Sequence, residues 1–432
     1  KTVESEDFGL TEEGFKSVQR YYQLDKSMYS TMYTEKDNLH PVYRDFRRLI
    51  LLGYYLFYQE KAQEHSKIVL NEKTQSVLKV WNLLQTGIFK FFSFLLRYRI
   101  RFQKLLHFQR LYPEITLDLV KSKITSWINL KEEFLELPIA MKDKELENTL
   151  DDLEVPSQDK VPVRLLSAKP LPDDPKETIN NPYFDGCIIH IHGGGWVSLS
   201  TDIYQTITRE WAKKCGKPVF SIEYRLAPEH CYPAGLDDCW QAYNWIIDHA
   251  EKVFGIRTNK VILVGDSAGG NLATALMALL IKTQRRLPDG IMLMYPALSI
   301  EDTQLAPSLM GSLEDIVLSA QFLKLCRSLY LGEYEYKGGD PLLSPSLMSD
   351  EYLEKFPPLR IVVGSGDPLR DECYRMLERL KKLGRDAQMK LYEGIPHGFI
   401  NLAFPTGFPG AKTCLHDCTE TIHSLLELTL NL

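Results

Sequence analysis

A β-branched, apolar run over Val261–Val264 ends abruptly at Gly265-Asp-Ser-Ala-Gly269, and an Ala/Leu-rich segment with helical spacing follows to Met277. This order predicts a strand, a very sharp turn and a helix, with Ser267 at the apex of the turn. Glycine on both sides of the apex fits such a turn, because side chains there would clash with the strained backbone. An ordinary glycine-containing loop is the alternative, and the flanking strand and helix patterns weigh against it.

The turn predicts serine chemistry, because a hydroxyl lifted clear of the backbone can attack a carbonyl once a base removes its proton. A second apolar strand, Cys187–His192, runs into Gly193-Gly-Gly195. Backbone N–H groups without side chains in the way can stabilise the negative charge that develops on a carbonyl oxygen during acyl transfer. We therefore expect an oxyanion hole here, with a plain glycine-rich turn as the alternative. We expect His192 to hold this loop by hydrogen bonding and not to act as the base.

In this strand arrangement the acid and the histidine follow the nucleophile along the chain. Asp367 stands where the apolar run that starts at Leu359 ends, and His397 stands in the loop after the next expected strand. We expect Asp367 to orient the imidazole of His397, and His397 to be the base for Ser267. A turn aspartate and a solvated loop histidine are the alternatives for each residue taken singly. Their shared order and strand context favour the catalytic interpretation.

The combined motifs resemble the hormone-sensitive lipase family of α/β-hydrolases. The resemblance covers most of residues 160–432 and rests on His192-Gly-Gly-Gly-Trp196, Tyr224-Arg-Leu-Ala-Pro-Glu-His230, Gly265-Asp-Ser-Ala-Gly269, Asp367-Pro-Leu-Arg-Asp371 and His397-Gly-Phe399. It implies an α/β-hydrolase fold with Ser267 as nucleophile, Asp367 as orienting acid and His397 as base. It further implies Gly194, Gly195 and Ala268 as oxyanion donors, and neutral lipid esters (acylglycerols or sterol esters) as substrates.

The chain departs from the animal members of this family between the nucleophile and the acid. Those members carry a long serine-rich regulatory insertion there. In this sequence Ser267 and Asp367 lie 100 positions apart, with no low-complexity tract between them. We therefore expect a short form of the family, and we do not extend hormone-driven phosphorylation to it.

The residues themselves require only a carboxylic ester with an apolar part. A soluble esterase for short acyl chains is one alternative to a lipid esterase, and a catalytically silent scaffold on the same fold is another. Scaffolds of this kind usually lack a triad member, whereas Ser267, Asp367 and His397 are all present. The expected chemistry requires no cofactor.

Two parts of the chain differ in pattern. Residues 1–155 are rich in Tyr, Phe and Leu, carry few glycines, and show helical spacing near 12–34, 41–64, 74–111 and 115–150. We expect an N-terminal all-helical domain or cap there, and an α/β catalytic domain over 156–432. Strands expected in a mainly parallel sheet lie near 161–166, 187–192, 218–224, 260–265, 290–295, 359–364 and 388–393. The segment near 297–340 is expected to be helical and to complete a lid.

A basic aromatic stretch runs from Lys73 to Pro113, with eight Lys and Arg residues and no Asp or Glu. Lys90 interrupts its apolar run, which is therefore too short to span a bilayer. A basic helix with Phe and Leu on its other face can lie on a membrane or lipid-droplet surface. The alternative is a core helix whose basic residues face solvent or pair with acids elsewhere.

Charge and cysteine usage narrow the remaining classes. The net charge of −6 and the pI near 6.0 argue against nucleic-acid binding. The eight cysteines are scattered, which is typical of free thiols in a reducing compartment, so we expect a cytoplasmic protein, peripheral on lipid droplets or membranes. Cys414 and Cys418 flank a histidine at helical spacing, but without a second ligand pair they do not predict a metal site. A homo-oligomer is compatible with the sequence.

A further group of charged residues follows the strand near 218–224. Arg225, Glu229 and His230 come first, and Asp237 and Asp238 follow soon after. Paired carboxylates can perform glycosidase chemistry. We expect instead that these residues fix loops through ion pairs and a helix N-terminus.

Overall fold

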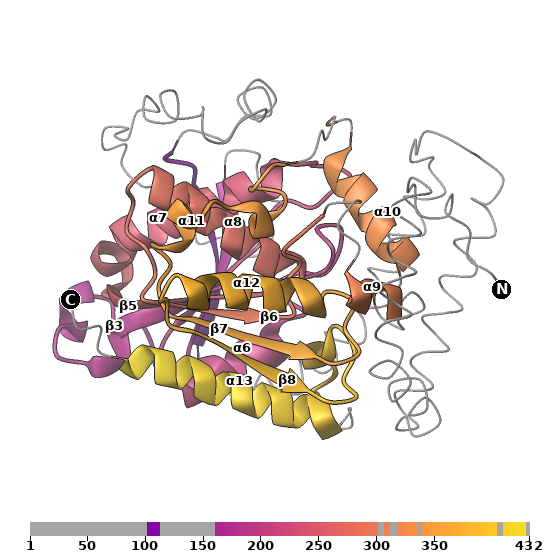
Figure 1. Ribbon diagram of the computed structural model, residues 1–432. Coiled ribbons are helices and arrows are strands. Elements are labelled where there is room, and N and C mark those ends of the chain that lie inside the picture. Colours follow the sequence, from indigo (N-terminus) through magenta and orange to yellow (C-terminus); the bar gives the residue numbers. More distant parts are fainter. Residues whose placement is uncertain are drawn as a thin grey trace.

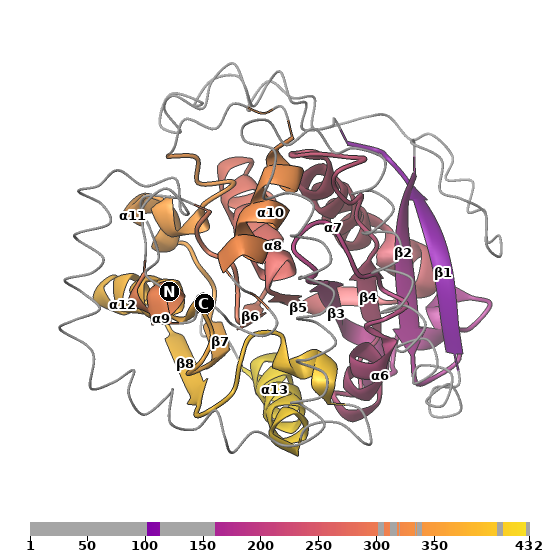
Figure 2. The same cartoon turned by 90° about the vertical axis from the view of Figure 1, so that its right-hand side faces the viewer.

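The computed structural model describes residues 102–112, 160–300, 306–311, 318, 320–332, 334, 339–403 and 409–428. Its centre is an eight-stranded sheet in the order β1-β2-β4-β3-β5-β6-β7-β8 (Figures 1 and 2). β1 with β2 and β2 with β4 are antiparallel, and all other neighbours are parallel, so the mainly parallel sheet is confirmed. The strands are β1 (Phe102–Gln109), β2 (Lys160–Ser167), β3 (Asp185–Ile191), β4 (Val219–Ile222), β5 (Arg257–Asp266), β6 (Gly290–Met294), β7 (Leu359–Gly364) and β8 (Ala387–Tyr392).

The seven strands that the sequence predicted correspond to β2 through β8. The central ones are recognisable because both of their faces are covered. Ile188 and Ile189, neighbours that point to opposite faces of β3, are both fully buried, and so are Val261 through Val264 of β5. A strand buried on two sides has a continuous apolar run in place of an alternating one.

Helices cover both faces of the sheet. α6 (Gln205–Lys214) and α13 (Pro409–Glu427) lie on one face, and α7 (Ala234–Phe254), α8 (Ala268–Lys282) and α12 (Arg370–Lys382) lie on the other (Figures 1 and 2). The short helix α11 (Asp350–Leu353) lies beside α12. Single turns of 3₁₀ helix occur at η6 (Pro175–Thr178), η7 (Pro182–Phe184), η8 (Pro345–Leu347) and η9 (Phe399–Leu402).

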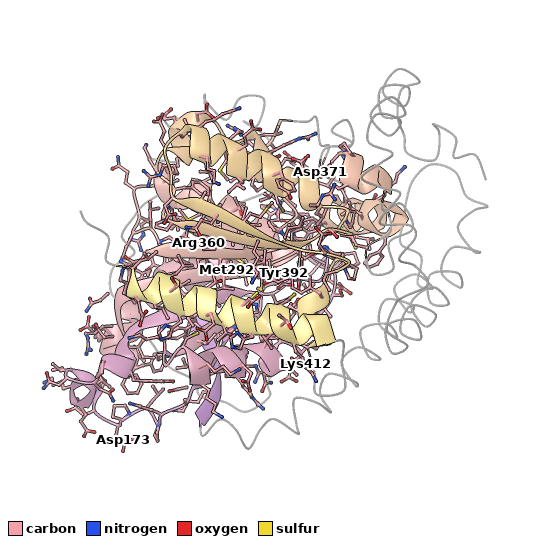
Figure 3. All side chains as sticks on the ribbon, turned by 60° about the horizontal axis from the view of Figure 1, so that its bottom comes forward. Asp173, Met292, Arg360, Asp371, Tyr392 and Lys412 are labelled. Atoms are coloured by element: carbon pink, nitrogen blue, oxygen red, sulfur yellow. The ribbon has the colours of Figure 1, made fainter. Side chains whose placement is uncertain are left out.

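The sheet and its two helical layers enclose the core. Met292 of β6 is fully buried at the middle of the sheet, whereas Asp173 and Lys412 are exposed at the periphery (Figure 3). α13 packs against β5 and β6. Because the parallel strands all point the same way, the loops after β3, β5, β7 and β8 meet at one edge of the sheet.

One secondary-structure prediction is wrong. Residues 102–109 were expected to end a helix over 74–111, but they form β1, which pairs with β2 along its whole length. Leu106 and Phe108 are buried while His107 and Gln109 are less so, which is the two-residue period of a strand. Phe108 also stacks on Trp245 of α7, with ring centroids 3.8 Å apart. Pairing with a distant strand thus overrides the local helical pattern.

The other N-terminal predictions fall outside the described residues. They are the helical domain over residues 1–155 and the lipid-contacting role of residues 73–113. Of both ranges, the structure describes only residues 102–112. Of the segment near 297–340, the described residues form two helices, α9 (Pro307–Gly311) and α10 (Ala320–Leu331), while residues 297–300 and 339–340 are not helical. Both helices lie beyond the carboxyl ends of the strands (Figure 1). Their function as a lid, and the domain division after residue 155, stay predictions.

Candidate active site

The turn between β5 and α8 has the sharp geometry that the sequence predicted. Ser267 separates the two elements and has φ 51° and ψ −120°. Residues other than glycine rarely adopt this positive φ, so the fold holds the Ser267 backbone in a strained conformation. A Cβ at Gly265 would lie 2.5 Å from the Gly269 oxygen, and a Cβ at Gly269 would lie 2.2 Å from the Ile191 oxygen. The turn therefore packs against the end of β3 with no room for larger residues.

Three loops bring Ser267, His397 and Asp367 together. The Ser267 Oγ lies 2.9 Å from the His397 Nε2, and the His397 Nδ1 lies 2.9 Å from the Asp367 Oδ2. Asp367 is fully buried, and its Oδ1 accepts a 2.8 Å hydrogen bond from the Leu369 N–H. A carboxylate at Nδ1 favours the tautomer that carries its proton there, which leaves Nε2 free to accept the serine proton.

The imidazole of His397 is also held by packing. Tyr295, which follows β6, contacts it edge to face at 4.8 Å between ring centroids. The same tyrosine contacts Phe399 at 4.8 Å, also edge to face. His397 is 4% exposed, so the ring has little freedom to rotate away from the serine.

The glycine loop after β3 carries the backbone groups that the sequence assigned to an oxyanion hole. Gly194 has φ 114°, and a Cβ there would lie 2.0 Å from the Ser198 oxygen, so only glycine fits. The Gly193 N–H donates to the Asp266 Oδ1 over 2.8 Å. Among the described residues, the N–H groups of Gly194, Gly195 and Ala268 have no acceptor. Ala268 also begins α8, whose N-terminus favours negative charge.

His192 holds this loop, as the sequence analysis expected. Its Nδ1 lies 2.7 Å from the Gly193 oxygen. Tyr224, which follows β4, donates from its hydroxyl to the His192 oxygen over 2.9 Å and stacks on the imidazole at 4.3 Å. The described contacts of His192 are therefore structural and lie in the glycine loop.

Helix α10 packs onto the glycine loop. The Trp196 ring stacks on Tyr330 of α10, with centroids 4.7 Å apart and planes 8° apart. A Cβ at Gly195 would lie 2.6 Å from the Cys326 Sγ of the same helix. Trp196 is 1% exposed, so it is a packing residue between the loop and α10.

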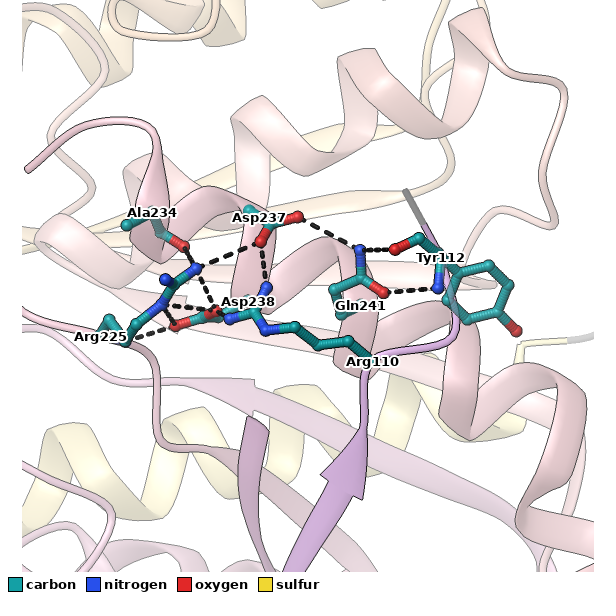
Figure 4. Close-up of polar contacts among 7 residues, drawn as sticks. All are labelled: Arg110, Tyr112, Arg225, Ala234, Asp237, Asp238 and Gln241. Carbon is teal, nitrogen blue, oxygen red and sulfur yellow. Dashed lines mark hydrogen bonds and ion pairs between the residues drawn. The ribbon is translucent and has the colours of Figure 1, made fainter. Parts of the chain in front are cut away.

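A second polar group lies at the same edge of the sheet and is shown in Figure 4. Arg225, which follows β4, pairs with Asp237 and Asp238 of α7 at 3.2 and 3.0 Å. Arg110, which follows β1, forms ion pairs with the same two carboxylates. These four residues are called the arginine–aspartate cluster below. Its charges are paired, as expected for loop-fixing residues, whereas Glu229 is exposed.

Two other features are absent from the described residues, a metal-binding cluster and a membrane-spanning helix. In that part of the chain, no three His, Cys, Asp or Glu side chains are grouped so that they could hold a metal ion. Nor does a helix in the described ranges combine the length and apolarity needed to cross a bilayer. All eight cysteines are free thiols, and seven of them are buried.

Comparisons with known proteins relate the chain to α/β-hydrolases. A family model of the α/β hydrolase fold matches residues 188–401. Hormone-sensitive lipase of Bos taurus is 39% identical over 145 residues, which are 34% of this chain and 19% of that protein. An esterase of Acinetobacter venetianus is 34% identical over 239 residues, which are 55% of this chain and 75% of that protein. The match thus spans about a fifth of the hormone-sensitive lipase and most of the bacterial esterase.

A solved structure is similar as well. The crystal structure of an esterase from the bacterial hormone-sensitive lipase family has 26% sequence identity and a TM-score of 0.52. The superposition covers 62% of this chain and 82% of that one.

Proposed function

The chain belongs to the hormone-sensitive lipase family of α/β-hydrolases, and on that premise we propose that it hydrolyses carboxylic esters through Ser267. The observation that carries the proposal is the continuous run of two 2.9 Å contacts from the Ser267 hydroxyl through His397 to Asp367. The strained turn supports it, because it presents the hydroxyl at the carboxyl edge of the sheet.

In the proposed reaction His397 removes the Ser267 proton as Oγ attacks the ester carbonyl. The imidazolium then gives that proton to the leaving alcohol, and an acyl-serine remains. Water, deprotonated by the same imidazole, attacks the acyl group and releases the carboxylic acid. Asp367 keeps the imidazole tautomer and stabilises the imidazolium without taking up the proton.

The developing oxyanion would accept hydrogen bonds from Gly194, Gly195 and Ala268. The support for these donors is their position beside the nucleophile, and the fact that they have no acceptor among the described residues. Preorganised donors of this kind stabilise the transition state without having to reorient during the reaction.

For the substrate we infer neutral lipid esters, namely acylglycerols or sterol esters. The support is the identity to a protein named hormone-sensitive lipase. A short-chain carboxylesterase is the second candidate, because the Acinetobacter venetianus relative and the bacterial structural neighbour are both named esterases. Cytoplasmic location, contact with a membrane or droplet surface through residues 73–113, and homo-oligomer formation belong to the same proposal.

A fluorophosphonate probe and a graded ester series test these points together. The probe should label wild type, and wild type should hydrolyse the esters. In Ser267→Ala the labelling should disappear and kcat should fall by about 10⁶-fold. The matched control is Ser167→Ala, since the Ser167 hydroxyl is buried at the opposite edge of the sheet, where it donates to the Lys169 oxygen. Absence of labelling in intact wild type would favour the silent scaffold.

The ester series separates the two substrate candidates. A lipid esterase should gain rate when long-chain acylglycerols pass from monomers to an emulsion, and it should prefer them to acetyl and butyryl esters. A short-chain esterase should show the opposite preference and no gain on emulsions. The second outcome would remove the lipid surface from the proposal and leave Ser267 in place.

A further inference from the structure

The carboxylate beside the nucleophile has a bonding pattern that the reaction above does not use. Asp266 is 1% exposed and directly precedes Ser267. Its Oδ1 accepts from the Gly193 N–H over 2.8 Å, and its Oδ2 accepts from the Tyr204 hydroxyl over 2.6 Å. The contact with the glycine loop is close, since a Cβ at Gly193 would lie 2.5 Å from the Asp266 Oδ2. One carboxylate thus joins the nucleophile turn to the residue before Gly194.

Tyr204 extends this connection to the histidine loop. Its hydroxyl accepts a 3.2 Å hydrogen bond from the Asn401 Nδ2 while it donates to Asp266. Asn401 lies in η9, four positions after His397. Tyr204 itself precedes α6 and is 1% exposed. Its single hydroxyl therefore stands between the loops that carry Ser267, Gly194 and His397.

The nearby histidine does not replace the tyrosine as a donor. The His190 Nε2 lies 3.9 Å from the Asp266 Oδ1, beyond hydrogen-bond distance. Burial lowers the pKa of His190, which keeps the imidazole neutral. Burial and the adjacent Asp266 carboxylate raise the pKa of Tyr204 well above its usual value, so its hydroxyl stays protonated and remains a donor. A buried carboxylate oxygen deprived of its donor is costly, and the carboxylate would be expected to move to find another.

We propose that Tyr204 is a positioning residue of the active site, whose hydroxyl fixes Asp266 and Asn401 so that the oxyanion loop and the histidine loop keep a common register with Ser267. This inference rests on the proposed function. In the proposed reaction Tyr204 does not contact the substrate. Without the hydroxyl, Asp266 loses one of its two donors and can shift the Gly193 N–H, and with it the N–H of Gly194. Asn401 loses its acceptor at the same time.

The test is Tyr204→Phe, which removes one oxygen atom and keeps the ring. The control is Tyr243→Phe, because Tyr243 is equally buried and donates to the Arg286 oxygen over 3.0 Å at the opposite edge of the sheet. We expect Tyr204→Phe to lower kcat by about 10- to 100-fold with KM within about 2-fold, because misplacement of reacting groups acts mainly on the transition state. Tyr243→Phe should keep kcat. The rate of fluorophosphonate labelling should fall in parallel with kcat.

A double-mutant cycle with Asn401→Ala tests the connection to the histidine loop. If Tyr204 acts through Asn401, the double variant should lose no more than about 2-fold beyond Tyr204→Phe alone. Multiplied losses would show that the two residues act independently and would overturn the coupling. If Tyr204→Phe does not fold, Asn401→Ala decides alone. A lower kcat in a variant that unfolds at the same temperature as wild type supports the inference, and an unchanged kcat overturns it.

The outcomes also separate this inference from the proposed function. Equal kcat in Tyr204→Phe and Tyr243→Phe, with an active and labelled wild type, overturns the positioning role and leaves the esterase proposal intact. A wild type that neither labels nor turns over overturns the esterase proposal, and the positioning role with it.

Discussion

The proposed active site and the arginine–aspartate cluster lie at the same edge of the sheet and both contain buried carboxylates, yet those carboxylates have different partners. In the cluster, Asp237 and Asp238 each pair with both Arg110 and Arg225, so opposite charges meet on every side. In the site, one buried carboxylate leads through an imidazole to a neutral hydroxyl. Beside that hydroxyl are N–H groups for which the described residues offer no acceptor.

The difference teaches what marks a reactive site in this fold. Both groups are polar, partly or fully buried and built from segments far apart in the sequence, so polarity and burial do not separate them. What separates them is pairing, because the charges of the cluster are matched by opposite charges within the protein. In the site, by contrast, N–H donors beside the hydroxyl have no acceptor among the described residues, and the oxygen of a reacting carbonyl would supply one.

Among changes that compare these two regions, the largest effect should come from Asp367, the carboxylate that bonds His397. Asp367→Asn removes the charge and reverses the preferred imidazole tautomer, so kcat should fall by about 10⁴-fold. The matched change in the cluster is Asp238→Asn, which should lower the free energy of unfolding and leave kcat nearly unchanged. Steady-state kinetics and urea unfolding of both variants check the contrast. Equal losses of kcat would mean that the two groups work as one site.

The next effect concerns the oxyanion loop. Gly194→Ala should lower kcat by about 10²- to 10³-fold, because the new Cβ would meet the Ser198 oxygen and displace a donor. Gly216→Ala is the control, since Gly216 also has a positive φ, 62°, but nothing within 4 Å of its Cβ position. It should share the backbone strain and keep kcat. If both variants lose the same activity, strain and not the oxyanion donor accounts for the loss.

A smaller effect, on stability, should come from the cluster. Arg110→Met removes one of the two guanidinium groups that pair with the two buried carboxylates, so the free energy of unfolding should fall by about 3 kcal/mol. Ester turnover at 25 °C should stay within about 3-fold, since Arg110 makes no contact with Ser267 or His397. The exposed pair Arg360–Asp386 gives the control, and Arg360→Met should cost about 0.5 kcal/mol. A selective loss of kcat in Arg110→Met would place the cluster in the active site.

Arg110 also shows where sequence reasoning stops. Ser267, Asp367 and His397 could be found because each follows an apolar strand in a fixed order, and the structure brings the three together. β1 could not, because its helical pattern is local and its pairing with β2 is set more than fifty positions away. Arg110 follows that strand, so its carboxylate partners were hidden with it.

The oxyanion loop shows a second limit. Its glycines are visible in the sequence, but the groups that hold it are single side chains without a motif of their own. Tyr224 stood in a quoted motif with no role assigned, and Tyr204 stood in none. A tyrosine before a helix is ordinary in sequence, and only the fold brings its hydroxyl to Asp266.

The smallest expected effect comes from His190 of β3, a buried residue whose imidazole is expected to stay neutral. His190 is fully buried, and its Nδ1 lies 2.8 Å from the Ser221 Oγ. Burial lowers its pKa from 6.5, against the opposing effect of Asp266. On acidification the unfolded chain therefore takes up a proton at His190 before the folded protein does. The unfolding free energy should fall as the pH drops below about 6.5, by at most about 1.4 kcal/mol per pH unit from this group.

His190→Asn isolates that contribution, because asparagine keeps a polar group near Ser221 and does not titrate. Urea unfolding from pH 7.5 to pH 5 should show a shallower loss of stability in the variant than in wild type. At pH 7.5 the His190 imidazole is neutral in both the folded and the unfolded chain. The free energies of unfolding of the two proteins should then differ only by the effect of the substitution on packing and hydrogen bonding. Parallel curves over the whole range would mean that His190 is protonated equally in both states. His190 and Asp266 would then form a paired charge beside Ser267, as the residues of the arginine–aspartate cluster do. The two regions would then differ only in the Ser267 hydroxyl and the N–H donors next to it.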